Sequence, residues 1–134
     1  TTPLFVASQE GKVDVVRLLL DAGAEVHRKD KNDATPLFMA SQYGHTEVVK
    51  LLLQHHADPN SRDNNLATPL IVASVQGHED VVRALLDSGA DVSLKNKWGK
   101  TALDRARENN HTGIMNMLQQ RMNEGMNEWM MIML

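Results

Sequence analysis

Apolar and polar residues recur along this chain with a period of 33 residues. The triplet Thr-Pro-Leu begins at Thr2, Thr35 and Thr68, and Thr-Ala-Leu begins at Thr101. An apolar run follows in the same register of the first three periods, at Val15–Leu20, Val48–Leu53 and Val81–Leu86. A fixed period of this length predicts a stacked array of small units, none of which can bury its apolar face alone.

Each unit is expected to contain two helices, as the second copy illustrates. The Thr35 side chain can cap the first helix, and Pro36 suits the first helical position, where no N–H is needed. This helix should end near Gly44, and the second should begin at Thr46, where the following glutamate is favoured by the helix dipole. The second helix is apolar on more than one stripe, so we expect its partner helix and both neighbouring units to cover it.

The segments between units predict projecting, hairpin-like loops, which we call the fingers and define as residues 30–34, 63–67 and 96–100. Their Asp and Asn content is typical of turns. Gly99 fits a tight turn, whereas Asp33 and Leu66 fill the same position less comfortably.

The second helices are expected to end at a left-handed residue. Gly23 and Gly89 hold this place in the first and third copies, where glycine adopts the left-handed conformation without strain. His56 holds it in the second copy, so we expect a strained backbone there.

In these motifs the chain resembles the ankyrin repeat family, whose period and Thr-Pro-Leu signature it shares. The resemblance covers about residues 1–121. It implies an all-α solenoid of helix–turn–helix repeats near 1–29, 30–62, 63–95 and 96–121. Where the family usually has histidine after the Thr-Pro-Leu triplet, this chain has Phe5, Phe38, Ile71 and Asp104. We expect apolar packing to replace the hydrogen bonds of that histidine.

The two ends of the array differ. In the fourth copy, polar residues replace apolar or small ones at Asp104, Arg105, Arg107 and Gln119, as a terminal capping repeat needs. The first copy has no such polar face, and the chain opens inside a repeat without an initiator methionine. We therefore expect a further repeat upstream, in a longer array.

Residues 122–134 form a Met-rich extension outside the repeats. Met122, Met126, Met130 and Met133 share one helical face, although Gly125 weakens a helix. The extension could be a helix that covers the end of the stack, a partner-binding peptide, or residues introduced by cloning. The first interpretation is favoured because methionine is an adaptable filler of irregular surfaces.

Composition excludes several classes of function. The 134 residues contain no cysteine, which excludes disulfides and thiolate metal sites and fits a cytoplasmic or nuclear protein. No run is long enough to span a membrane, and no secretory signal is visible. His45, His78 and His111 recur in one register, which favours a structural role over a metal site. With no catalytic motif present, we expect neither an enzyme nor a cofactor.

Charge is polarised along the array. Half of the fourteen basic residues lie in or beside the fingers: Arg28, Lys29, Lys31, Arg62, Lys95, Lys97 and Lys100. Finger carboxylates dilute this basic edge, and a pI near 6.0 argues against nucleic-acid binding. The pattern favours a protein-binding surface, and a partner with acidic residues.

The family resemblance implies that a protein or peptide binds the concave face made by fingers and first helices. Carried over by position, the contact residues are Lys31, Asn32, Ala34, Gln42, Tyr43, Asn64, Asn65, Ala67, Val75, Gln76, Lys97, Trp98 and Lys100. Tyr43 and Trp98 are expected to be the anchors, because aromatic residues are enriched at interface hot spots. Simple packing over the last finger is the alternative for Trp98.

Other readings remain. The array could be a structural or autoinhibitory segment of a larger protein. Asn60 lies where some ankyrin proteins are hydroxylated on asparagine, although Pro59 departs from the preferred pattern. We expect a monomer unless the Met-rich extension self-associates.

Overall fold

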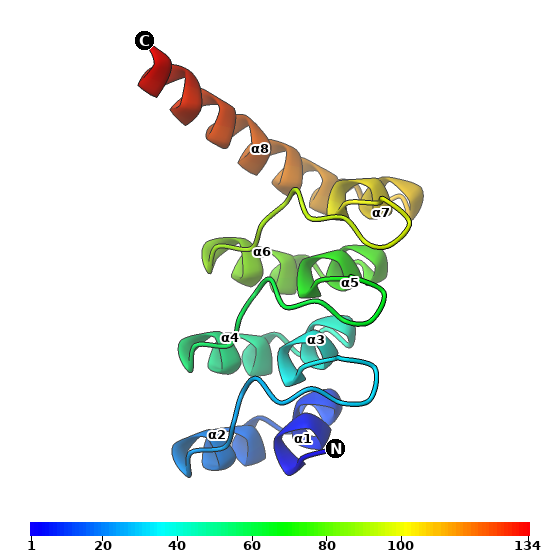
Figure 1. The fold of residues 1–134 in the computed structure, drawn as a ribbon, viewed down its shortest axis with the longest axis vertical. Coiled ribbons are helices and arrows are strands. Elements are labelled where there is room, and N and C mark those ends of the chain that lie inside the picture. Colours follow the sequence, from blue (N-terminus) through cyan, green and yellow to red (C-terminus); the bar gives the residue numbers. More distant parts are fainter.

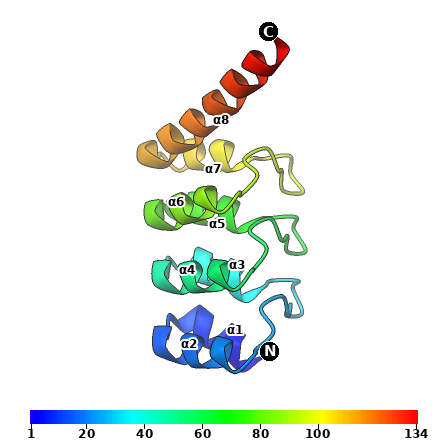
Figure 2. The same cartoon turned by 90° about the vertical axis from the view of Figure 1, so that its left-hand side faces the viewer.

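The computed structural model describes all 134 residues as eight α-helices arranged in four pairs. The helices are α1 Pro3–Glu10, α2 Val13–Asp21, α3 Pro36–Gln42, α4 Thr46–Gln54, α5 Pro69–Gln76, α6 Glu79–Asp87, α7 Ala102–Glu108 and α8 Thr112–Met133. The pairs stack in chain order, so that α1, α3, α5 and α7 form one layer and the second helices form the other (Figures 1 and 2). The predicted all-α solenoid is confirmed.

The first helices begin and end as their residues predict. Thr2, Thr35, Thr68 and Thr101 each accept a hydrogen bond through Oγ1 from the backbone N–H three residues on, at 3.1–3.2 Å. Each helix is followed by a residue with positive φ, which is Gly11, Gly44, Gly77 or Asn110. The expected apolar packing after the triplet is confirmed at Phe5, Phe38 and Ile71, which are buried. It is wrong at Asp104, whose carboxylate instead accepts a hydrogen bond from the Thr101 backbone N–H.

The second helices differ in how far their neighbours cover them. Val48 in α4 and Val81 in α6 are fully buried between neighbouring pairs. At the corresponding position of α2, Val15 is 45% exposed, and Leu18 of the same helix is 70% exposed. These two side chains are exposed because only α4 packs beside α2 in the second-helix layer.

A left-handed residue follows the second helix in three of the pairs. Gly23, His56 and Gly89 have φ values of 88°, 70° and 88°, which confirms the expected backbone of His56. Met122 stands at the same position of the fourth pair. Since no left-handed residue stops it there, α8 runs on to Met133 and passes residue 121 without a break.

The Met-rich extension lies outside the stack. Figures 1 and 2 show the second half of α8 running away from the other helices, and every residue from 122 to 134 is exposed. The expectation that this segment covers the last repeat is therefore wrong. The uninterrupted axis of α8 carries the extension away from α7, and Gly125 does not break the helix.

The outer face of the last pair is polar. Ser8, Ser41 and Ser74 are fully buried in the earlier pairs, whereas Arg107 is exposed at the corresponding position. Gln119 is exposed where the earlier second helices have leucine. These residues allow α7 and α8 to end the stack against water.

Candidate functional site

Each finger is folded around its first side chain. Oδ1 of Asp30 accepts hydrogen bonds from the backbone N–H groups of Asn32 and Ala34, at 2.8 and 2.9 Å. Asp63 and Asn96 make the same two bonds within their own fingers. The tight turn falls at Asp33, Leu66 and Gly99, with φ of 61°, 60° and 75°. The three fingers therefore have one conformation, which the Asx side chain fixes.

Successive fingers are also joined to one another. The backbone N–H of Asn64 donates to the carbonyl oxygen of Asn32 at 3.0 Å, and Lys97 donates to Asn65 at 2.9 Å. At the base, an Arg62 guanidinium N–H donates to the Lys95 carbonyl at 2.7 Å. These bonds hold the fingers in a row with fixed spacing (Figure 2).

A groove of about 620 Å³ lies between this row of fingers and the layer formed by α3, α5 and α7. We call it the finger groove. Nine of the thirteen residues predicted from the sequence line it: Asn32, Ala34, Gln42, Tyr43, Asn64, Asn65, Ala67, Val75 and Trp98. The other four, Lys31, Gln76, Lys97 and Lys100, are exposed but do not line it.

Two of the predicted residues offer little side-chain surface. Ala34 and Ala67 close the first two fingers, and these residues are only 5% and 9% exposed. Their position after the turn places them against the first helices. They form part of the floor of the finger groove.

The structure adds lining residues that the sequence reasoning missed. The finger bases contribute Asp30, Asp63 and Asn96, and the first helices contribute Phe38, Met39, Ile71, Val72 and Arg105. Met39, Val72 and Arg105 occupy one register, so the period itself could have identified them. In the sequence Arg105 indicates only a polar substitution of a capping repeat, but in the structure its side chain lines the groove at the last repeat.

Both predicted aromatic anchors lie outside the core. Tyr43, at the end of α3, is 50% exposed, and Trp98, in the last finger, is 64% exposed. The Lys97 ammonium lies 4.7 Å from the centre of the Trp98 ring, within cation–π range. Apart from this contact the Trp98 ring is largely open to water, which favours a surface role over packing.

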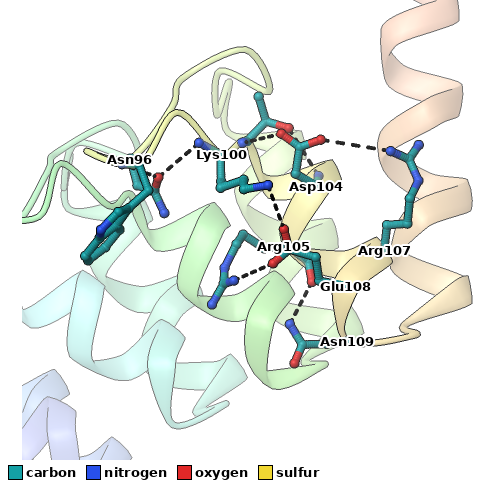
Figure 3. Close-up of polar contacts among 9 residues, drawn as sticks. Asn96, Lys100, Asp104, Arg105, Arg107, Glu108 and Asn109 are labelled. Atoms are coloured by element: carbon teal, nitrogen blue, oxygen red, sulfur yellow. Dashed lines mark hydrogen bonds and ion pairs between the residues drawn. The ribbon is translucent and has the colours of Figure 1, made fainter.

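A polar network surrounds the end of the groove at the last repeat (Figure 3). The Lys100 ammonium lies 3.2 Å from a Glu108 carboxylate oxygen, and Arg105 donates to the other oxygen. Hydrogen bonds from Lys100 and then Arg105 lower the pKa of Glu108. Lys100 is thus already paired within the chain, whereas Lys31 and Lys97 have no carboxylate within ion-pair distance.

The recurring histidines link neighbouring repeats. Nε2 of His45, His78 and His111 lies 2.9–3.0 Å from the carbonyl oxygens of Gln9, Gln42 and Val75 respectively. Their predicted structural role is confirmed. No three His, Asp or Glu side chains come close enough together to hold a metal ion. None of the helices is both long and apolar enough to cross a membrane.

Asn60 is occupied by contacts between repeats. Its Oδ1 accepts a hydrogen bond from the backbone N–H of Asp91 at 2.7 Å, and its Nδ2 lies 3.5 Å from the Gly89 carbonyl oxygen. Its own backbone N–H donates to Asp58. These contacts give the Asn60 side chain a structural role in joining the second and third repeats.

Comparison with known proteins supports a repeat assignment over most of the chain. The family profile described as ankyrin repeats, in three copies, matches residues 4–96 and 62–127. The 2-5A-dependent ribonuclease of Mus musculus is 59% identical over 34 residues, which is 25% of this chain and 5% of that protein. This likeness has the length of one repeat. Ankyrin repeats are generally protein-interaction modules and are typically non-catalytic.

Proposed function

Because the chain belongs to the ankyrin repeat family, we propose that it binds a protein or peptide partner along the finger groove, without catalysis or cofactor. The observation that carries this proposal is the groove itself. It brings the exposed aromatic residues Tyr43 and Trp98 onto one continuous surface with the fingers. Rigid scaffolds that present exposed aromatic side chains in a groove are suited to anchoring a partner.

Variation between repeats supports the same surface. The core positions keep their residue types from copy to copy, as with Leu4, Leu37 and Leu70, which are all buried. The finger tips do not, since Lys31, Asn64 and Lys97 share one register. A constant core with finger residues that differ between repeats is the arrangement expected of a surface that recognises a partner.

Charge favours a partner with acidic residues near both ends of the finger row. Lys31 and Lys97 project without a carboxylate partner in the chain, whereas Lys100 is paired with Glu108. Unpaired lysines at the edge of an interface attract acidic partners and mainly speed association. We therefore assign steering to Lys31 and Lys97, and a smaller part to Lys100.

The main alternative is a structural or autoinhibitory segment within a larger protein. The match to a 2-5A-dependent ribonuclease covers about one repeat and 5% of that protein, so it supports the repeat and not its activity. The two proposals differ in whether the finger groove is free to bind a separate molecule. Binding by the isolated chain therefore distinguishes them.

The test begins with a pull-down from cell extract, using as bait the parent chain or a Tyr43→Ala/Trp98→Ala variant. Proteins lost with the variant are then titrated by calorimetry. Each single alanine substitution is expected to raise the dissociation constant about 30-fold, as truncation of a central aromatic residue often does. Thermal melting should not change, because both side chains lie outside the core.

Glu47→Ala is the matched control. Glu47 lies on α4, away from the finger groove, with a side chain 69% exposed. It should bind like the parent chain. Loss of binding in Glu47→Ala, with binding intact in Tyr43→Ala and Trp98→Ala, would refute the assignment of the face. Failure of the isolated chain to bind any protein through these residues would favour the structural alternative.

A further inference from the structure

The Met-rich extension carries an apolar seam that no other part of the chain covers. Met122, Met126, Trp129 and Met133 follow one another at spacings of four, three and four residues. Their exposed fractions are 39%, 63%, 62% and 66%. Alternating spacings of three and four place side chains along one edge of a helix, in the pattern through which helices pair. We call these four residues the extension seam.

We propose that the extension seam pairs with the same seam of a second copy of this chain, with the two helices antiparallel. In an antiparallel pair, the seam residues of the second copy run in the reverse order, so each seam residue faces a different seam residue of the other copy. Met126 then faces Trp129 of the second copy, and Met122 faces Met133. Each contact occurs twice about a two-fold axis, as in most homodimers. The thioether of Met126 against the Trp129 ring is a favourable sulfur–aromatic contact.

Residues beside the seam fit this arrangement. Gly125 and Ile132 flank the seam on the same side, and an antiparallel pairing brings the small residue of one copy opposite the large one of the other. The charged residues of the extension, Glu124 and Glu128, lie on the helix face away from the seam and stay in water. The pairing thus buries no charge, which would otherwise oppose it.

The geometry of α8 makes the seam accessible to a second copy. The stack lies at one end of α8, and the extension points away from it in both views (Figures 1 and 2). An antiparallel pair keeps the two stacks at opposite ends, whereas a parallel pair would crowd them together. A membrane surface is a poorer occupant, because the extension has two glutamates and no basic residue.

The apolar area that two extensions can bury is enough for a dimer that forms reversibly. Each copy contributes six apolar side chains, the four of the seam together with Met130 and Ile132. Burying one large apolar side chain removes about 60–120 Å² from water, as its usual transfer free energy implies. The twelve side chains of the pair therefore bury roughly 700–1,400 Å² in total. Specific interfaces start near about 1,200 Å², so we expect dissociation in the micromolar range.

Sedimentation of the full chain between about 1 and 100 μM tests the proposal, since this range spans micromolar dissociation. The 14.9 kDa monomer should give way to a species of twice that mass as concentration rises. Met126→Glu should raise the dissociation constant at least about 100-fold, because it buries an unpaired carboxylate twice. Met131→Glu is the control, since Met131 is 78% exposed and lies off the seam. It should dimerise like the parent.

The double variant Met126→Glu/Trp129→Lys tests the direction of the helices. In the antiparallel pair each introduced carboxylate faces an introduced ammonium, so the double variant should dimerise more tightly than Met126→Glu alone. Disulfide cross-linking also tests the direction of the helices. Because the chain contains no cysteine, only the introduced cysteines can form a disulfide. A mixture of Met126→Cys and Trp129→Cys chains should cross-link under mild oxidation, whereas each variant alone should cross-link poorly.

Three outcomes would overturn the proposal. The first is a chain that stays monomeric across the concentration range. The second is a dimer that Met126→Glu leaves unchanged, or in which each cysteine variant cross-links with itself. The third is a monomer that instead binds vesicles of phosphatidylcholine through the extension, which would make lipid the occupant.

Discussion

The imidazole of His78 lies directly against the backbone of Gly44 in the preceding repeat. Its Nε2 is 3.0 Å from the carbonyl oxygen of Gln42, and a Cβ added to Gly44 would stand 2.6 Å from its Nδ1. His45 and His111 approach Gly11 and Gly77 in the same way. Each histidine thus closes the end of the previous first helix, and the glycine is required for space as well as for its positive φ.

Gly44→Ala should destabilise the domain by about 2–4 kcal/mol, from left-handed strain together with the clash against His78. Gly89→Ala is the matched control. Gly89 has φ of 88°, but nothing lies within 4 Å of its added Cβ, so only the backbone strain of about 1–2 kcal/mol applies. Urea unfolding of the two variants measures the difference, and equal losses would show that the imidazole moves aside freely.

His56→Gly should stabilise the domain by about 0.5–1 kcal/mol, because it relieves a left-handed residue while adding chain entropy to the unfolded state. The side chain of His56 is exposed and its φ is 70°, so little packing is lost. The urea midpoint should rise. A midpoint that stays the same or falls would mean that His56 makes a stabilising contact that offsets the strain.

Asp104 should make the last repeat sensitive to acid. The hydrogen bond from the Thr101 backbone N–H, 3.0 Å from Oδ2, lowers the pKa of Asp104. Near the ordinary pKa of about 3.9, the Asp104 carboxyl therefore binds more protons in the unfolded state than in the folded state. Its contribution to the free energy of unfolding is fully present above that pH. It is lost as the pH falls through the lowered folded value.

Asp104→Asn should therefore cost less than about 1 kcal/mol at neutral pH, since the Asp104 side chain is 38% exposed. Its stability should also fall less steeply than that of the parent chain below about pH 4. Thermal melting over a pH series measures both quantities. Parallel curves for the two proteins would show that the Asp104 carboxylate contributes nothing in the folded state.

Lys97→Glu should slow association with the partner, chiefly at low salt, because rim charges act on encounter rates. Lys100→Glu is the matched comparison in the same finger. Lys100 is already neutralised by Glu108, so its reversal should slow association less. Stopped-flow association rates at two salt concentrations decide the order, and a larger effect at Lys100 would contradict the steering assigned to Lys97.

Most of the fold could be predicted from the sequence because, in each repeat, the residues at the helix ends determine where the helices begin and end. Thr35 and Pro36 start a helix, and Gly44 ends it, without reference to distant residues. The course of the extension was missed, although its signal was local too. Met122 stands where Gly23 and Gly89 stop the earlier second helices, so the absence of a stop could have predicted a longer α8.

The candidate site was harder to predict because it depends on how repeats meet. Position within the repeat identified nine residues that line the finger groove. It gave no indication that Lys100 pairs with Glu108, or that Ala34 and Ala67 are buried. These facts depend on side chains that come together only in three dimensions.

Because α8 is unbroken, it fixes the direction in which the extension seam faces relative to the stack. A helix turns by about 100° and rises about 1.5 Å with each residue. Deleting one residue between Leu118 and Met122 would leave the repeats in place but swing the seam through about 100° around the helix axis. The direction in which the extension seam faces is therefore set by the number of residues before it as much as by their identity.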